Sequence, residues 1–207
     1  MEPLQRHLPD IAIAAALAWG SGLRAYAVIF ALGLAGAAGW LELPEHLRLL
    51  QHPIVLGASG LMTAVEFFAD KLPWLDSLWD AVHSFIRIPA GAALAAAVFG
   101  DSDSAVMLAA AILGGTLAAG SHLTKAGSRV AINTSPEPFS NWAASFGEEL
   151  AVGTILWLAF AHPVIALVVL AVLVAFTIWL IPKVWRMLRA IANRVIGFFD
   201  RSHHPTP

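Results

Sequence analysis

Two groups of charged residues interrupt long apolar stretches of this sequence, and a charge in an apolar setting needs a partner or a function. In the segment 54–71, Glu66 and Asp70 share one helical face because a spacing of four residues returns to the same side, and Lys71 follows them. A second face, in the segment 105–133, carries His122, Lys125, Arg129 and Asn133. The two faces have opposite signs, so they predict complementary partners.

A carboxylate at membrane depth must pair with a cation, take up a proton or bind a metal ion. We therefore expect the carboxylates of the first face and the cations of the second to meet across a shared, partly hydrated cavity. Such a cavity could hold a small ion or solute. The alternative is a ladder of ion pairs that only lock the structure together.

Other polar residues extend this candidate site. Arg24 interrupts the first apolar stretch, Asp76 follows Pro73, and Glu148 lies in the polar half of the segment 142–160. The segment 133–141 is rich in hydroxyls and amides, and its candidates are Asn133, Ser135, Glu137 and Asn141. These side chains could cap the helix that follows or hold an anion at its N-terminus.

Asp76, Asp80 and His83 recur at helical spacing and are the candidates for metal ligands. The alternative is a solvated helix at the membrane interface. Arg87, just before Pro89, is expected to extend to the lipid headgroups. Neither a metal nor any other cofactor can be assigned from these spacings.

The composition indicates a membrane protein. Of the 207 residues, 58% are apolar and only 13% charged, and the mean hydropathy is +0.73. A soluble domain has about a quarter charged residues. The net charge of −2 gives no reason to expect nucleic-acid binding, and the absence of cysteine excludes disulfides and thiol chemistry.

Apolar runs predict an all-α, polytopic bundle of about six membrane segments, some of them short or broken. These runs cover residues 11–38, 54–68, 88–99, 105–133, 142–160 and 163–181. The run 88–99 is too short to span a bilayer alone. Residues 182–207 form a basic amphipathic tail, which the positive-inside rule places in the cytoplasm. An even number of segments then puts both termini there.

Residues 1–181 are expected to form a single transmembrane domain, with halves at 10–99 and 105–181. Gly20-Ser21-Gly22-Leu23-Arg24 resembles Gly120-Ser121-His122-Leu123-Thr124-Lys125, and a helix with acidic residues follows each motif. Three segments in each half would have opposite orientations, so the pattern predicts an inverted repeat of the kind found in secondary transporters.

The polar motifs also resemble a known family. Residues 66–73 (EFFADKLP), Asp76, Trp79, Asp80 and residues 87–91 (RIPAG) resemble its first signature. Residues 122–129 (HLTKAGSR), residues 133–141 (NTSPEPFSN) and Ser145 through Glu149 resemble its second. The family is the bacterial membrane-protein family known as domain of unknown function 4126. The resemblance covers about residues 10–180 and implies an integral membrane protein of the bacterial inner membrane without an established activity.

Three functions fit these residues. The first is a transporter or channel for a small polar or charged solute, with the site between the segments 54–68, 105–133 and 142–160. The second is a membrane-embedded enzyme for a lipid or isoprenoid phosphate, with His122 as acid/base and Lys125 and Arg129 on the phosphate. The third is a non-catalytic scaffold. The lipid bilayer and the solute are the expected partners, and the sequence leaves the oligomeric state open.

Overall fold

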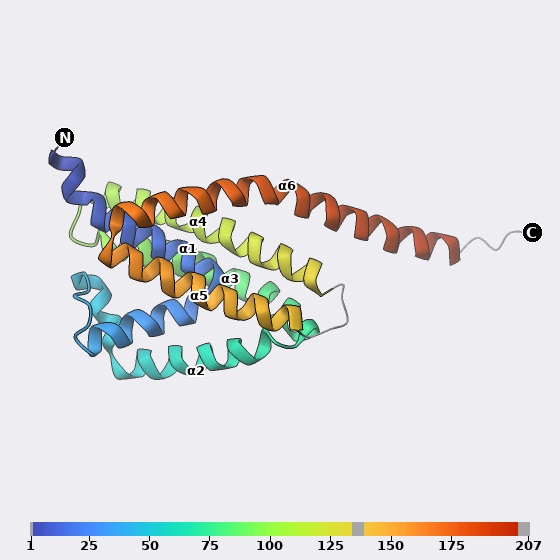
Figure 1. Ribbon diagram of the computed structural model, residues 1–207, viewed down its shortest axis with the longest axis horizontal. Coiled ribbons are helices and arrows are strands. Elements are labelled where there is room, and N and C mark those ends of the chain that lie inside the picture. Colours follow the sequence, from blue (N-terminus) through green and yellow to red (C-terminus); the bar gives the residue numbers. More distant parts are fainter. Residues whose placement is uncertain (1, 134–138, 203–207) are drawn as a thin grey trace, which may run out of the picture.

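The computed structural model describes residues 2–133 and 139–202, which form six α-helices and one short 3-10 helix (Figure 1). No strand occurs in this part of the chain. The elements are α1 (Glu2–Ala37), η1 (Glu45–Gln51), α2 (Pro53–Ala69), α3 (Pro73–Val98), α4 (Ser104–Ile132), α5 (Phe139–Ala161) and α6 (Pro163–Ser202).

Local sequence explains where several helices begin. Pro53, Pro73 and Pro163 each stand at the first position of a helix, where a missing N–H costs nothing and the fixed backbone angle favours the helix. His52 caps α2 by accepting a hydrogen bond from the backbone N–H of residue 54 at 3.3 Å. Asp103 caps α4 in the same way, at 2.7 Å from the N–H of residue 105.

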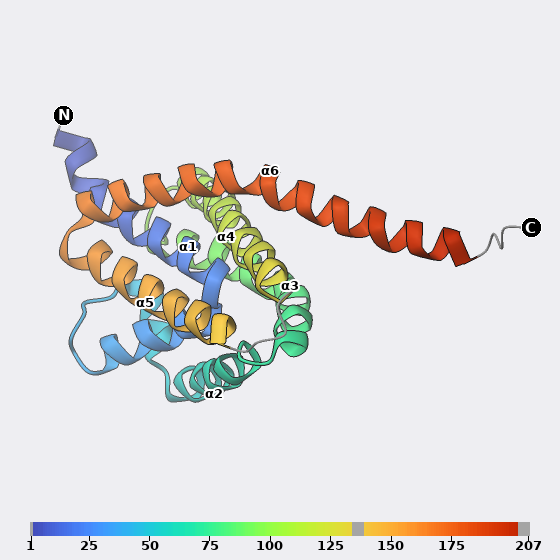
Figure 2. The ribbon, with the colours of Figure 1, turned by 45° about the vertical axis from the view of Figure 1, so that its right-hand side comes forward.

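Helix α1 is broken at Arg24, whose backbone angles of φ −150° and ψ 76° are not helical. A Cβ atom built on Gly20 would lie 3.0 Å from a methyl group of Val28. In a straight helix, eight residues rise by about 12 Å, so the two halves must fold back on each other. Figures 1 and 2 show this V, with both arms ending at the same end of the bundle.

The fold-back shows that the apolar run over residues 11–38, which Arg24 interrupts, forms two arms. The residues 7–37 are long and apolar enough to cross a membrane, but the break divides α1 into a longer and a shorter arm. Neither arm continues through to the far end of the bundle in Figures 1 and 2. Arg24 lies at the vertex, inside the protein.

Helix α3 corrects the division of residues 72–99 into a mixed stretch and a short apolar run. It continues for 26 residues through Pro89, and residues 75–98 are long and apolar enough to span a bilayer. The sequence did not predict this span, because the charged residues of the segment were expected at the membrane interface. In the structure they are buried inside the bundle.

Five helices of the described chain are long and apolar enough to cross a membrane, and six if η1 and α2 are taken together. Those two are bent by 68° relative to each other. Large apolar side chains cover the outer surfaces of α4 and α6, where Leu108, Ile112, Val168 and Val172 are exposed. The chain is therefore a polytopic helical membrane protein.

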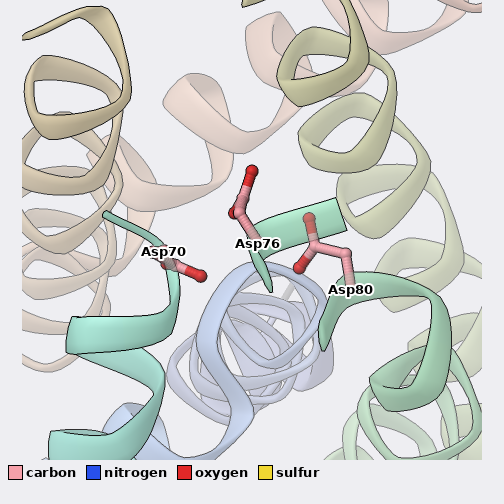
Figure 3. A group of neighbouring side chains, drawn as sticks. All are labelled: Asp70, Asp76 and Asp80. Atoms are coloured by element: carbon pink, nitrogen blue, oxygen red, sulfur yellow. The ribbon is translucent and has the colours of Figure 1, made fainter. Parts of the chain in front are cut away.

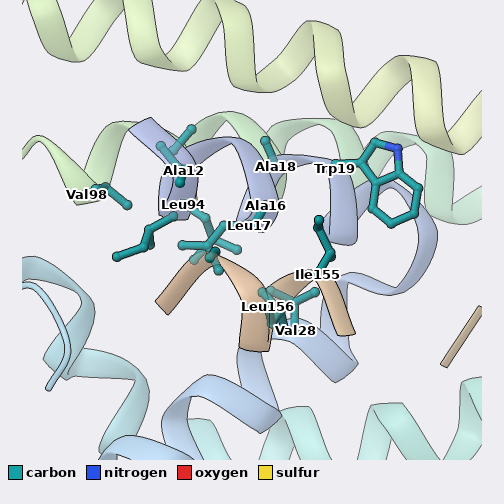
Figure 4. Packing of buried hydrophobic residues seen from close by; sticks show 14 of the residues in the cluster. Ala12, Ala16, Leu17, Ala18, Trp19, Val28, Leu94, Val98, Ile155 and Leu156 are labelled. Atoms are coloured by element: carbon teal, nitrogen blue, oxygen red, sulfur yellow. The ribbon is translucent and has the colours of Figure 1, made fainter. Parts of the chain in front are cut away.

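The first arm of α1 lies at the centre of the bundle and packs on α3, α4, α5 and α6. Its buried face is rich in alanine, and Ala12, Ala16 and Ala18 meet Leu94 and Ile155 in the core (Figure 4). A Cβ atom on Gly91 would be only 2.5 Å from the Cβ of Ala118. Small residues thus allow α1, α3 and α4 to approach closely, as is usual in lipid.

Helix α6 runs without interruption from Pro163 to Ser202 and projects beyond the other helices (Figure 1). Pro182 lies inside it, so the change from membrane span to basic tail is not marked by the end of a helix. The proposed counterparts α1 and α4 also differ, because α4 is continuous past Lys125. The inverted repeat stays a prediction.

Candidate functional site

Nine charged side chains gather inside the bundle, and eight of them are almost completely buried. They come from the break in α1, the end of α2, α3, α4 and α5. We call this group the ionic cluster, and its members are Arg24, Glu66, Asp70, Asp76, Asp80, Arg87, Lys125, Arg129 and Glu148. Glu148, with a side chain 12% exposed, is the most exposed member.

Lys125 of α4 is the cation at the centre of the cluster. Its Nζ lies 3.0 Å from the Asp70 carboxylate, 3.2 Å from that of Glu148 and 3.6 Å from that of Asp80. It also donates a hydrogen bond to the backbone carbonyl of Leu23 at 3.3 Å. That carbonyl lies at the break in α1, where the helical ladder is interrupted. Lys125 therefore ties four other segments together and satisfies a backbone group inside the membrane.

Arg24 extends from the break toward α2 and α5. Its guanidinium donates to the Asp70 carboxylate at 2.6 Å and to the Ser145 hydroxyl at 2.7 Å. Glu148 and Glu149 lie farther away, at 3.7 Å and 3.5 Å. The non-helical backbone at Arg24 thus places a cation among three acidic residues.

Arg129 connects α4 with α5 and with the end of α2. Two of its nitrogens donate to one Glu148 oxygen, at 3.0 Å and 3.1 Å. Another donates to the backbone carbonyl of Asp70 and to the side-chain oxygen of Asn141, both at 3.1 Å. Asp76 is 3.7 Å from the same guanidinium.

Arg87 forms a second centre on α3, where the sequence had suggested contact with lipid headgroups. It is fully buried, contacts Glu66 and lies 2.5 Å from Asp80. It also faces the Nδ1 of His122 at 3.3 Å, and the other ring nitrogen of His122 lies 2.6 Å from the Ser84 hydroxyl. The expectation that Glu66 meets the cations of α4 is therefore corrected, since its partner comes from α3.

The two asparagines join the cluster from the loop-facing ends of α4 and α5. Asn133 donates to the Asp76 carboxylate at 3.2 Å and to the Ser77 hydroxyl at 2.9 Å. Asn141 donates to the side-chain oxygen of Asn133 at 2.7 Å. The candidates Ser135 and Glu137 fall outside the described residues.

Asp70 and Lys71 lie in the short connection between α2 and α3. Burial opposes ionisation of the Asp70 carboxyl, but Lys125, Arg24 and Arg129 outweigh it and hold the pKa of Asp70 below its usual value. Lys71 is only half-buried, and its ammonium lies 2.8 Å from the centre of the Phe67 ring. Desolvation lowers the pKa of Lys71.

Asp70, Asp76 and Asp80 form a group whose potential ligand oxygens all lie within 4.8 Å of one another (Figure 3). His83 is not part of it: its Nδ1 lies 2.8 Å from the carbonyl of Trp79, and its ring stacks on the Trp79 indole. Four cations contact the three carboxylates. A divalent metal ion would be repelled by them, so the group is a poor metal site.

A cleft of about 360 Å³ between α1, α4, α5 and α6 reaches the edge of the ionic cluster. Most of its walls are apolar, and its polar lining consists of Ser121, Thr124, Lys125, Ser128, Glu148 and Thr177. It shares Gly147, Ala151 and Leu173 with a neighbouring cleft of about 280 Å³ along α5 and α6. Lys125 and Glu148 are the cluster members that line it.

Comparison with known proteins identifies the family. The model of the domain of unknown function DUF4126 matches residues 11–183. This chain belongs to the DUF4126 family. No curated protein and no solved structure matches it. The matched range ends within α6, so the family region contains the whole ionic cluster and the cleft.

Within this DUF4126 chain, most candidates named from the sequence lie in or beside the cluster. Glu66, Asp70, Asp76, Lys125, Arg129, Glu148 and Arg24 are members, while Asn133, Asn141 and His122 contact members. Lys71 lies at the rim. Sequence reasoning missed Arg87 and Ser145. Arg87 could have been found from its spacing of seven residues from Asp80, which places both on one face of a helix.

Proposed function

We propose that this protein transports a small polar or charged solute across the membrane, and that the solute reaches the ionic cluster through the cleft at Lys125 and Glu148. The observation that carries the proposal is the meeting of a charged cluster, a broken helix and a cleft at one place in an apolar bundle. Broken helices and charges at membrane depth are tolerated where they line a cavity.

The scaffold is the main alternative, because every cation of the cluster contacts at least one carboxylate. Such pairs could be purely structural. The cleft favours transport, since a scaffold has no need of a cavity that reaches Lys125 and Glu148. The enzyme is less well supported. His122 is 3% exposed, and both of its ring nitrogens already have partners, Ser84 and Arg87. A bound phosphate would also have to displace the carboxylates that contact Lys125 and Arg129.

The proposal includes a location in the bacterial inner membrane and a sidedness. One end of the bundle contains the last turn of α2, the first turn of α5 and the projecting part of α6. The basic residues of these parts and of the connection after α2 are Lys71, Lys183, Arg186 and Arg189. The segments 38–52 and 99–103 lie at the other end and contain one basic residue, Arg48. The positive-inside rule then places the projecting end of α6 in the cytoplasm.

The beginning of α1 lies at the opposite end from that projecting end (Figures 1 and 2). The sequence placed both termini on one side, on the basis of an even number of crossings. The fold-back at Arg24 argues against this. The proposal therefore places the start of α1 outside.

The test is flux through proteoliposomes that contain the purified protein. Currents on a solid-supported membrane would be recorded for sodium, potassium, chloride, phosphate and acetate. Ala144 lines the cleft, whereas the neighbouring Ala143 is exposed and does not. Ala144→Leu should narrow the cleft and suppress a current that the matched control Ala143→Leu retains. Equal currents in both variants would contradict the path through the cleft. No current in the wild type for any of these ions would support the scaffold.

A further inference from the structure

The ionic cluster does not balance its charges when all its carboxyl groups are ionised. It contains four cations (Arg24, Arg87, Lys125 and Arg129) and five carboxylates (Glu66, Asp70, Asp76, Asp80 and Glu148). At the rim, Lys71 and Glu149 offset each other. One negative charge is left over in a buried site. An uncompensated charge in such a place is expensive, so the site should take up a positive charge.

Asp76 is the carboxylate with the weakest cation contact. The other four each have a cation at 3.0 Å or closer, whereas the nearest cation contact of Asp76 is 3.7 Å from Arg129. Asp76 is also fully buried. One of its oxygens accepts from Asn133, and the other has no hydrogen-bond donor.

Two neighbouring carboxylates also have an oxygen without a hydrogen-bond donor. One carboxylate oxygen of Asp70 and one of Asp80 are also buried without a donor. The three side chains surround one space in Figure 3, with potential ligand oxygens within 4.8 Å of one another. A hydrogen atom on one of these three buried oxygens would give the group a donor.

We propose that Asp70, Asp76 and Asp80 together bind one exchangeable proton, which Asp76 carries. A proton from the aqueous phase adds to the orphaned oxygen of Asp76, and the resulting carboxylic acid faces the carboxylates of Asp70 and Asp80. The carboxylate becomes a neutral acid, no other bond changes, and the cluster becomes electrically neutral. A proton fits where a metal ion does not, because it needs no coordination shell among the four cations.

The surroundings of Asp76 are set by several elements. Arg129 and Asn133 face it from α4, Asp80 from α3 and Asp70 from the end of α2. Lys125 and Glu148 act on it through Asp70 and Arg129. Glu137 lies outside the described residues.

The histidines are the competing proton acceptors. The Nδ1 of His122 accepts from Arg87, so this ring is neutral. His83 is buried and uses Nδ1 on a carbonyl, and its protonation would also balance the cluster. An experiment on the proton site must separate Asp76 from His83.

Infrared difference spectroscopy makes that separation on the full-length protein in liposomes. The C=O stretch of a protonated carboxylic acid should be present in acidic buffer and disappear reversibly in alkaline buffer. Asp76→Asn should remove this band, because the amide balances the charge and supplies a donor. His83→Gln should retain it. Asp101→Asn, at an exposed acid outside the cluster, is the matched control and should also retain it.

A band that survives Asp76→Asn unchanged, or a wild type without a pH-dependent band, would overturn the inference. If Asp76→Asn folds poorly, the melting temperature of His83→Gln decides, because His83 cannot contribute in that variant. It should fall reversibly from acidic to alkaline buffer, and a flat profile would overturn the inference. The use of this proton to drive transport rests on the proposed function. A band without any flux would refute only the transport proposal, and flux without a band would refute only the proton site.

Discussion

A single lysine holds much of the charged interior together. Lys125 contacts carboxylates from the end of α2, from α3 and from α5, and also the carbonyl at the break in α1. Buried ion pairs add little net stability, but loss of one partner leaves the others uncompensated. Lys125 is therefore the residue at which the energetic role of the cluster can best be measured.

Lys125→Met should lower the free energy of unfolding by about 3 to 5 kcal/mol. The methionine has a similar length, so the effect reports the lost charge rather than a cavity. Lys183→Met is the matched control, because this lysine is exposed and its ammonium lies over the Trp179 ring. It should cost less than about 1 kcal/mol. Unfolding in mixed detergent micelles measures the free energy of unfolding of both variants. Equal losses would show that the buried charge of Lys125 contributes no more to stability than the charge of an exposed lysine.

The partner of Glu66 gives a second prediction at this scale. A double-mutant cycle with Glu66→Gln and Arg87→Gln should give a coupling of about 0.5 to 3 kcal/mol, because the two groups are in contact. The cycle of Glu66→Gln with Arg129→Gln should give a smaller coupling, because these two groups are linked only through other members of the ionic cluster. Strong coupling in the second cycle and none in the first would contradict the pairing described above.

Most charged positions of the site could be predicted from the sequence, but their pairing could not. Periodicity placed Lys125 and Arg129 on one face of a helix, and the structure has them there. The partner of Glu66 is on α3, 21 residues away, and no local pattern indicates which helix lies opposite. Arg87 was missed because its place just before Pro89 and the short apolar run 88–99 suggested contact with the lipid headgroups.

At the scale of the element, the decisive feature is the V of α1. Its vertex rests against α4, and the Ser121 hydroxyl donates to the carbonyl of Trp19 at 2.8 Å. Gly22 packs so closely that an added Cβ would collide with Ser121 and with the backbone of Ala118. The contact between the vertex and α4 thus requires a residue without a side chain.

Gly22→Ala should destabilise the protein by about 1 to 3 kcal/mol, as overpacking in a tight contact does. Gly57→Ala is the matched control, because a Cβ there would meet nothing within 4 Å and Gly57 lies inside α2. It should be neutral or stabilise by up to about 1 kcal/mol. Thermal unfolding in detergent measures both, and a tolerated Gly22→Ala would contradict the close approach of α1 and α4.

The helices themselves were largely predictable, but the break was not. Apolar runs indicated α4, α5 and the membrane part of α6, because length and hydropathy are properties of one segment. The fold-back depends on the contacts of Arg24 with Asp70 and Ser145, which come from residues 46 and 121 positions away. A tertiary interaction of this kind leaves no mark on the hydropathy of the segment.

At the scale of the whole molecule, the V is the basis of the proposed topology. If only α2 to α6 cross the membrane, the start of α1 and the projecting end of α6 face opposite sides. Cysteines introduced at exposed positions test this, because the protein has none of its own. His7→Cys and Ser102→Cys should react from outside with a membrane-impermeant thiol reagent, and Arg186→Cys only after permeabilisation. If His7→Cys and Arg186→Cys react from the same side, both ends of the chain face that side and the number of crossings is even.

The claim that the cleft gives a solute access to the ionic cluster can be tested most directly with one further pair of cysteines. Ala144→Cys should react with a charged, water-soluble thiol reagent, and the reaction should abolish the current in proteoliposomes. Treatment of Ala143→Cys, which is exposed but lies outside the cleft, should leave the current unchanged. An unreactive Ala144→Cys, or a modified one that conducts normally, would contradict the account.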